Sequence, residues 1–234
     1  MSNKREQQRL AKEQKQQAAE RKDATMKLLG KVALFGVLPV FILLVIFTFV
    51  SQGPTYSPIE IADNDHVRGD AASPVIMTMY ADFQCPACAQ EFALITRAWP
   101  QLRDKTKLVF RHYPLTDMHA YAWTAALYAE AAARQEKFWE MHDLLFVNQS
   151  YWSTLTTNEV ELEFDMYASQ LGLDLEQLHA DMTTDEVIQK LRSDQRGGNL
   201  AGVRSTPTLF INGNLVVVNS MTRLIELVNQ AAGG

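Results

Sequence analysis

The sequence predicts one mixed α/β domain, in which a block of helices interrupts a sheet, preceded by an apolar segment. Two observations carry this prediction. The patterns after residue 64 run strand, helix, strand, helical block, hairpin and helix, which is the order of an α/β sheet with a helical insertion. The chain has 234 residues, enough for one well-filled domain with attachments.

Charge is distributed unevenly along the chain. Residues 1–31 contain nine Lys and Arg against four Asp and Glu. The net charge is therefore about +5 on this segment and about −10 on the rest of the chain. We expect a basic, solvated and partly disordered cytoplasmic tail over 1–31. An acidic main body argues against a nucleic-acid partner, which would need a basic face to neutralise phosphates.

Residues 32–50 are uncharged, with Thr48 as the only polar side chain. Nineteen helical residues extend roughly 28 Å, close to the hydrocarbon thickness of a bilayer, and predict a transmembrane anchor. A cleaved signal peptide is the alternative, but its apolar core is usually about 7 to 15 residues long, and only Ser51-Gln52-Gly53 offers a weak cleavage site. The basic residues before the span predict a single-pass inner-membrane protein with a cytoplasmic N-terminus and an extracytoplasmic, periplasmic domain.

A turn-rich stretch follows the apolar segment, and residues 51–63 are expected to be a tether. The domain then occupies 64–234. Its first strand is expected at 74–80, an apolar run after Pro74. The helix that follows is expected to begin at Pro86 and to extend to about residue 102, and a second strand is expected at 107–113.

The helical insertion is expected at about 115–198. Thr157 or Asn158 ahead of Glu161 resembles a helix-start cap, and Gly172 and Gly197-Gly198 resemble helix stops. Strands at 208–211 and 215–218 flank an Asn-Gly turn, which is a strong hairpin signal. A last helix is expected over Met221–Gln230.

Cys85 and Cys88 are the only cysteines of the chain. If the helix begins at Pro86, Cys85 lies at its cap, where unpaired amides and the helix dipole stabilise a thiolate. Cys88 lies one turn inside the helix. This gives Cys85 the attacking or attacked role and Cys88 the resolving role.

Two other interpretations of the pair are weaker. A metal site needs further ligands, and no third cysteine and no closely spaced histidine pair exists, so no metal and no cofactor are expected. A purely structural bridge would close a loop too small to constrain the unfolded chain much.

Four ordered motifs resemble a known family. "GDAASPVIMTMYADFQCPAC", "VFRHYPL", "KFWEMHDLLF" and "STPTLFINGN" are similar to the DsbA-like thiol-disulfide oxidoreductases of the thioredoxin superfamily, especially the membrane-tethered bacterial branch. The likeness covers about residues 64–230. It implies a thioredoxin fold with an inserted helical domain.

The resemblance also implies roles for individual residues. Cys85 matches the family's nucleophile and Cys88 its resolving cysteine, with Pro86 and Ala87 as the dipeptide that tunes the reduction potential. Thr206 and Pro207 match a cis-proline loop that binds substrate beside the disulfide. One position departs from the pattern, because Met79 stands where relatives often carry a buried acid that assists proton transfer.

These observations predict an enzyme that introduces disulfides into extracytoplasmic proteins containing cysteines. The resemblance suggests a membrane quinone-linked thiol oxidase as the partner that recycles it. A reductase or isomerase of the same fold is the alternative within this chemistry, and a redox-inert binding module or chaperone is the alternative outside it.

Overall fold

The structure is a computed structural model that describes residues 57–233, the helix α2 (Leu38–Val50) and the isolated positions 15, 22, 26, 35 and 36. The chain divides into two compact units, residues 1–53 and 54–234.

In the first unit, α2 has 13 residues, all of them uncharged. Within the described residues, no helix combines the length and the apolar character needed to cross a bilayer. The predicted span over 32–50 includes positions 32–34 and 37, which lie outside the described residues. Nearly all of the predicted tail at 1–31 and the first part of the tether at 51–56, with the weak cleavage site, lie outside them as well.

The second unit is built on a five-stranded sheet of order β1-β3-β2-β4-β5. Its strands are β1 (His66–Gly69), β2 (Ile76–Ala81), β3 (Lys107–His112), β4 (Thr208–Ile211) and β5 (Asn214–Val216). Only the central pair β2 and β3 is parallel, and the other pairs are antiparallel. Because β2 and β3 are parallel neighbours, the chain has to cross over between them, and the helix α3 (Pro86–Leu102) makes that crossover.

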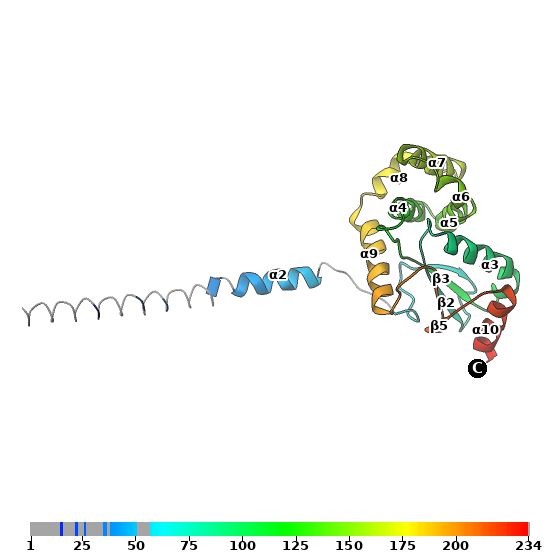
Figure 1. Cartoon of the computed structure of the whole chain (residues 1–234), viewed down its shortest axis with the longest axis horizontal. Coiled ribbons are helices and arrows are strands. Elements are labelled where there is room, and N and C mark those ends of the chain that lie inside the picture. Colours follow the sequence, from blue (N-terminus) through cyan, green and yellow to red (C-terminus); the bar gives the residue numbers. More distant parts are fainter. Residues whose placement is uncertain are drawn as a thin grey trace, which may run out of the picture. The chain divides into compact units, whose positions relative to one another are not determined.

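The two faces of the sheet have separate cores. On β2, Met77, Met79 and Ala81 belong to the main core, which includes α3 and α10 (Met221–Gly233). The alternate residue Tyr80 belongs to a smaller aromatic cluster on the other face, beside α9 (Asp185–Leu200). Figure 1 shows α9 on one flank of the sheet and α3 and α10 on the other.

The predicted helical insertion consists of six helices between β3 and β4. They are α4 (Ala122–Ala133), α5 (Phe138–Val147), α6 (Gln149–Trp152), α7 (Thr157–Gln170), α8 (Leu175–Asp181) and α9. Helices α4 to α8 gather at one end of this unit (Figure 1). The expected mixed α/β fold with a helical insertion is thereby confirmed.

Two local signals were assigned to the wrong residues. The start of α7 is capped by Thr156 with Glu159, each bonding the other's backbone, and not by Thr157 or Asn158 with Glu161. Gly197-Gly198 does not stop a helix, because α9 continues through both residues to Leu200. The chain takes its positive φ four residues after Gly198, at Gly202, where φ is 85°.

The sequence-based prediction also missed β1, a short edge strand. Gly69 at its end has φ 106°, and a Cβ there would lie 2.4 Å from the carbonyl oxygen of Thr106. The hairpin was predicted correctly: Asn212 and Gly213 both have positive φ and join β4 to β5, as a two-residue turn requires.

Candidate functional site

The two cysteines lie at the start of α3. Cys85 is the N-cap residue, with extended backbone (φ −73°, ψ 119°), and Pro86 is the first helical residue, as predicted. Proline fits this position because it has no amide hydrogen that would need a partner in the first turn. The carbonyl oxygen of Cys85 accepts from the amides of Cys88 and Ala89, at 3.0 and 3.2 Å.

The two thiols are chemically unequal. Both are free, Cys85 is 7 % exposed and Cys88 is fully buried. A hydrogen bond from the Cys88 thiol, aided by backbone amides at the helix start, outweighs burial and lowers the pKa of Cys85 to about 5. Burial, together with that same hydrogen bond, raises the pKa of Cys88. At neutral pH the pair therefore holds one thiolate, at Cys85, and one proton, at Cys88.

The loop before β4 lies against the cysteines. The Thr206-Pro207 peptide bond is cis, as expected. The sulfur of Cys85 lies 3.4 Å from the carbonyl oxygen of Thr206, 121 residues away in sequence. The structure thus brings the two predicted parts of the site together, while Pro86 and Ala87 are exposed on its outer side.

Gln149 is a site residue that the sequence analysis missed. Its buried side-chain amide donates to the carbonyl oxygens of Phe83 and Cys85, at 2.8 and 2.7 Å. Gln149 opens the short helix α6, so these bonds tie the helical insertion to the loop that carries the cysteines. The sequence shows it only as the middle of an Asn-Gln-Ser triplet, which gives no sign of this contact.

Asp82, three residues before Cys85, makes both local and long-range contacts. One carboxylate oxygen does accept locally, from the amide of Gln84 at 2.7 Å. The other accepts from the amide of Leu115 at 2.8 Å and lies 2.7 Å from Nδ1 of His119. The amide of Asp82 itself donates to the sulfur of Cys88 at 3.5 Å. Met79 is a buried, apolar residue of the core and offers no proton acceptor.

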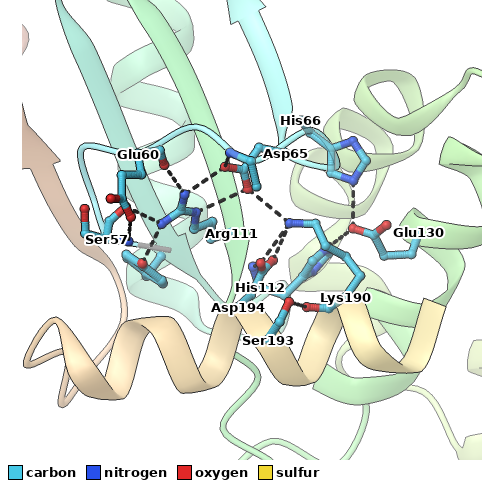
Figure 2. Close-up of polar contacts among 12 residues, drawn as sticks. Ser57, Glu60, Asp65, His66, Arg111, His112, Glu130, Lys190, Ser193 and Asp194 are labelled. Atoms are coloured by element: carbon cyan, nitrogen blue, oxygen red, sulfur yellow. Dashed lines mark hydrogen bonds and ion pairs between the residues drawn. The ribbon is translucent and has the colours of Figure 1, made fainter. Parts of the chain in front are cut away.

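A second polar cluster is buried where the N-terminal segment of this unit meets the sheet and the insertion (Figure 2). Arg111 binds both carboxylate oxygens of Asp65, at 3.2 and 2.7 Å, and the ammonium group of Lys190 lies between Asp65 and Asp194, at 3.2 and 2.8 Å. Burial alone would raise the pKa of Asp65, but the bond from Arg111 and the nearby cations lower it.

Within the described residues, His66, His112 and Glu130 are a set of three side chains that could hold a metal ion, with donor atoms within 4.8 Å of one another. Nε2 of each histidine lies 2.7 Å from the same oxygen of Glu130. Histidine spacing in the sequence gave no sign of this grouping. The distances are those of hydrogen bonds, and Lys190 interacts electrostatically with Glu130, which opposes a further cation. The arrangement suits a hydrogen-bond network better than a metal site.

A thioredoxin-like sheet, a thiol pair of unequal acidity at a helix start and an adjacent cis-proline loop together define the class of thioredoxin-fold proteins with a paired-cysteine site. The chain belongs to the thioredoxin family: a family model described as "Thioredoxin" matches residues 62–229.

Solved structures share this fold. A thioredoxin-like oxidoreductase from Silicibacter pomeroyi superposes with a TM-score of 0.63 at 24 % identity, over 74 % of this chain and 95 % of the other. α-DsbA1 from Wolbachia pipientis superposes with a TM-score of 0.64 at 18 % identity, over 74 % of this chain and 93 % of the other. Oxidised BdbD from Bacillus subtilis superposes with a TM-score of 0.64 at 18 % identity, over 78 % of this chain and 100 % of the other.

Curated relatives are much longer than the matched stretch. A protein of Salinispora tropica named Na(+)/H(+) antiporter NhaA 3 is 39 % identical in an alignment of 157 residues, and the alignment covers 64 % of this chain and 22 % of the relative. A Herminiimonas arsenicoxydans protein named Na(+)/H(+) antiporter NhaA is 32 % identical over 173 residues, 72 % of this chain and 25 % of the relative. The chain thus spans about a quarter or less of their length.

Proposed function

We propose that this protein introduces disulfide bonds into extracytoplasmic proteins through the Cys85–Cys88 pair. The observation that carries the proposal is the inequality of the two thiols. Cys85, partly accessible and with a pKa of about 5, suits the sulfur that exchanges with a client. Cys88, fully buried and with a raised pKa, suits the sulfur that closes and reopens the internal disulfide.

In the proposed reaction, a client thiolate attacks the sulfur of Cys85 in the oxidised enzyme. The bond between Cys85 and Cys88 breaks, and its electron pair leaves with Cys88, which takes up a proton. A second client thiolate then attacks the client sulfur of the mixed disulfide and releases Cys85 as a thiolate. The client loses two electrons to the enzyme disulfide. The backbone at Thr206, beside Cys85, is the proposed docking strand for an extended client segment.

The stabilised thiolate supports the proposed oxidising direction. A low pKa at Cys85 favours the reduced enzyme, and this makes the disulfide a stronger oxidant. The test is the reduction potential of the full-length protein in glutathione buffers, with Cys88→Ala as a control that cannot form the internal disulfide. We expect a potential well above about −270 mV, the value of thioredoxin. A potential at or below that value would instead favour the alternative of a reductase.

We also propose a membrane arrangement for this protein, and its apolar segment supports that arrangement. Residues 32–50 anchor it in the inner membrane, the basic tail lies in the cytoplasm, and a quinone-linked thiol oxidase in the membrane restores the disulfide. In intact cells, a membrane-impermeant maleimide should label Cys85 of a Cys88→Ala variant. Labelling only after the cells are permeabilised would place the domain in the cytoplasm and refute the arrangement.

A redox-inert binding module with the same fold is the alternative from another class. The two interpretations differ in thiol reactivity. If the reduced protein is the proposed enzyme, an alkylating reagent should modify one thiol, Cys85, rapidly at pH about 6. An inert pair would be modified slowly at both positions. Mass spectrometry after a brief iodoacetamide pulse distinguishes them.

A further inference from the structure

Strand β5 is an edge of the sheet and carries apolar side chains on both of its faces. Val216, and Val218 just beyond the strand, pack against the main core. The alternate residues Leu215 and Val217 are 66 % and 83 % exposed. The open face of an antiparallel edge strand usually carries polar or charged residues, because a bare apolar edge invites other chains to bind. The composition of this face therefore suits an apolar partner.

Ile59 extends this apolar row at the turn that begins β5. Gly213 stands two residues before Leu215, and a Cβ on Gly213 would lie 3.5 Å from the Cβ of Ile59. Ile59 is itself 51 % exposed. These three exposed side chains, Ile59, Leu215 and Val217, are called the edge patch below.

The segment through which the chain enters the domain lies on the same face of the sheet. The strand register places three residues side by side on this face: Thr78, Phe210 and Leu215. The hydroxyl of Thr78 donates to the carbonyl oxygen of Pro58 at 2.6 Å. Arg111 donates to the carbonyl oxygen of Ser57 at 2.9 Å. The entering segment is therefore fixed beside the edge patch.

The sequence leaves little chain between Ser57 and the expected membrane span. Residues 51–56 separate Ser57 from the apolar segment 32–50. The steps from residue 50 to residue 57 cover at most about 25 Å when fully extended. In the proposed membrane arrangement, on which this inference rests, Ser57 and the edge patch beside it therefore stay close to the bilayer surface.

Charge also favours this hairpin as the part of the domain that meets lipid. Residues 212–220 include no Asp, Glu, Lys or Arg, and Asn and Ser residues flank the apolar ones. The chain after residue 31 carries a net charge of about −10, so an anionic headgroup layer repels much of the domain. The uncharged hairpin avoids this repulsion, and its polar side chains suit the headgroup layer.

We propose that the edge patch rests on the lipid surface of the membrane that anchors the protein. Leu215 and Val217 enter the boundary between headgroups and acyl chains, about 5–10 Å deep, as other peripheral apolar surfaces do. Ile59 lies beside them and continues the contact toward the entering segment.

This docking places the thiol pair near the bilayer. The register that pairs Leu209 with Val216 brings Val217 level with Thr208, the residue after Pro207. The edge patch thus ends near the cis-proline loop that contacts Cys85. A domain held by this patch keeps Cys85 close to the membrane surface, where the proposed quinone-linked oxidase lies.

The test is tryptophan quenching in the full-length protein, reconstituted into phosphatidylcholine vesicles with or without dibrominated acyl chains. Val217→Trp adds a reporter to the patch. Brominated chains should quench at least about half of the fluorescence that it adds over wild type, because a side chain at this depth lies next to the acyl chains. Leu215→Trp is a second reporter with the same expected result, so the test does not depend on the folding of one variant.

Leu162→Trp is the matched control for the affinity of tryptophan itself for lipid. Leu162 is 69 % exposed on α7, which lies far from β5 in Figure 1. The fluorescence that this variant adds over wild type should be the same with and without bromine. Quenching at both patch positions and not at Leu162 supports the docking.

Other results would overturn the docking in distinguishable ways. Patch reporters that are not quenched more than the control, in protein that floats with the vesicles, would overturn the docking and leave the anchor and the redox function intact. A dimer in detergent that Leu215→Lys separates into monomers would assign the patch to a second copy of this chain. Protein that does not float would overturn the membrane arrangement as well, while the reduction potential tests the redox function separately.

Discussion

At the scale of single residues, the chemistry of this protein depends on where one proton and one negative charge lie. The thiolate belongs to Cys85 because the neighbouring thiol and the amides at the start of α3 all donate toward its sulfur. The proton belongs to Cys88 because burial penalises its charged form. A difference of one helical turn thus separates the more acidic thiol from the buried one, and the proposed reaction assigns the client to the more acidic thiol.

The acidity of Cys85 predicts a pH dependence of stability. Folding lowers its pKa from the ordinary 9.0 to about 5. A group with a lowered folded pKa stabilises the native state fully above its unfolded pKa, and this contribution disappears as the pH falls toward the folded value. The reduced protein should therefore lose this stabilisation between pH 9 and pH 5.

Urea unfolding of reduced wild type and of Cys85→Ser at pH 9, 7 and 5 measures this contribution. The stability advantage of the wild type over the variant should shrink steadily toward pH 5. An advantage that stays constant over this range would mean that Cys85 is not a stabilised thiolate.

Gln149 gives a second prediction at the residue scale. In Gln149→Leu, the carbonyls of Phe83 and Cys85 lose a buried donor, so we expect a loss of about 1–3 kcal/mol in the free energy of unfolding. Gln170→Leu, at an exposed position of α7, is the control and should stay within about 0.5 kcal/mol of wild type. Similar losses in both variants would show that Gln149 does not hold the cysteine loop.

At the scale of elements, two signals that are local in sequence gave correct predictions, while the cap of α7 was placed one or two residues too late. The proline at the start of α3 and the Asn-Gly turn between β4 and β5 act through φ values of the residues themselves, so they can be recognised without the fold. Gly198 could not be recognised in this way. It resembles a helix stop, but it lies inside α9. The position requires glycine because a Cβ there would come within 2.9 Å of the Tyr113 ring.

Gly198→Ala should therefore destabilise the protein. In an open helix this substitution would gain about 1 kcal/mol. Here the ring of Tyr113 is held by hydrogen bonds from its hydroxyl to Asn199 and to the carbonyl of Val203, at 2.6 and 3.2 Å, so it cannot move aside cheaply. We expect the overpacking cost of about 1–3 kcal/mol to exceed the gain in helix propensity.

The control is Gly233→Ala near the end of α10, where a Cβ meets nothing within 4 Å. It should be neutral or slightly stabilising in thermal unfolding. If Gly198→Ala were equally neutral, the close contact between α9 and the sheet would not explain this glycine.

At the scale of the whole domain, long-range contacts assemble what the sequence could not reveal. The motif order predicted the sheet, the insertion and the approach of Thr206 to Cys85. It did not predict which polar residues would be buried together. Asp65 lies 46 residues from Arg111 and 125 from Lys190, and spacing alone does not reveal a partnership over such distances. The bond between Asp82 and His119, 37 residues apart, was missed for the same reason.

The buried charges of Figure 2 link the start of the domain, the sheet and the helical insertion, and this leads to a last prediction. Lys190→Met leaves Asp65 and Asp194 buried without that cation, so we expect a loss of about 3–5 kcal/mol. Adding Asp194→Asn removes one of the stranded charges and should recover part of this loss. Lys137→Met is the matched control, because its pair with Glu140 at 2.9 Å is solvent-exposed.

The control should cost less than about 1 kcal/mol, since water screens an exposed pair. Urea unfolding of the four proteins decides between two views of the cluster. If Lys190→Met costs no more than Lys137→Met, the cluster contributes little to holding the insertion on the sheet. If the double variant is more stable than Lys190→Met alone, the stability loss of Lys190→Met arises from uncompensated charge and not from the missing side-chain volume. The ion-pair network then holds in place the insertion that supplies Gln149 to the cysteine loop.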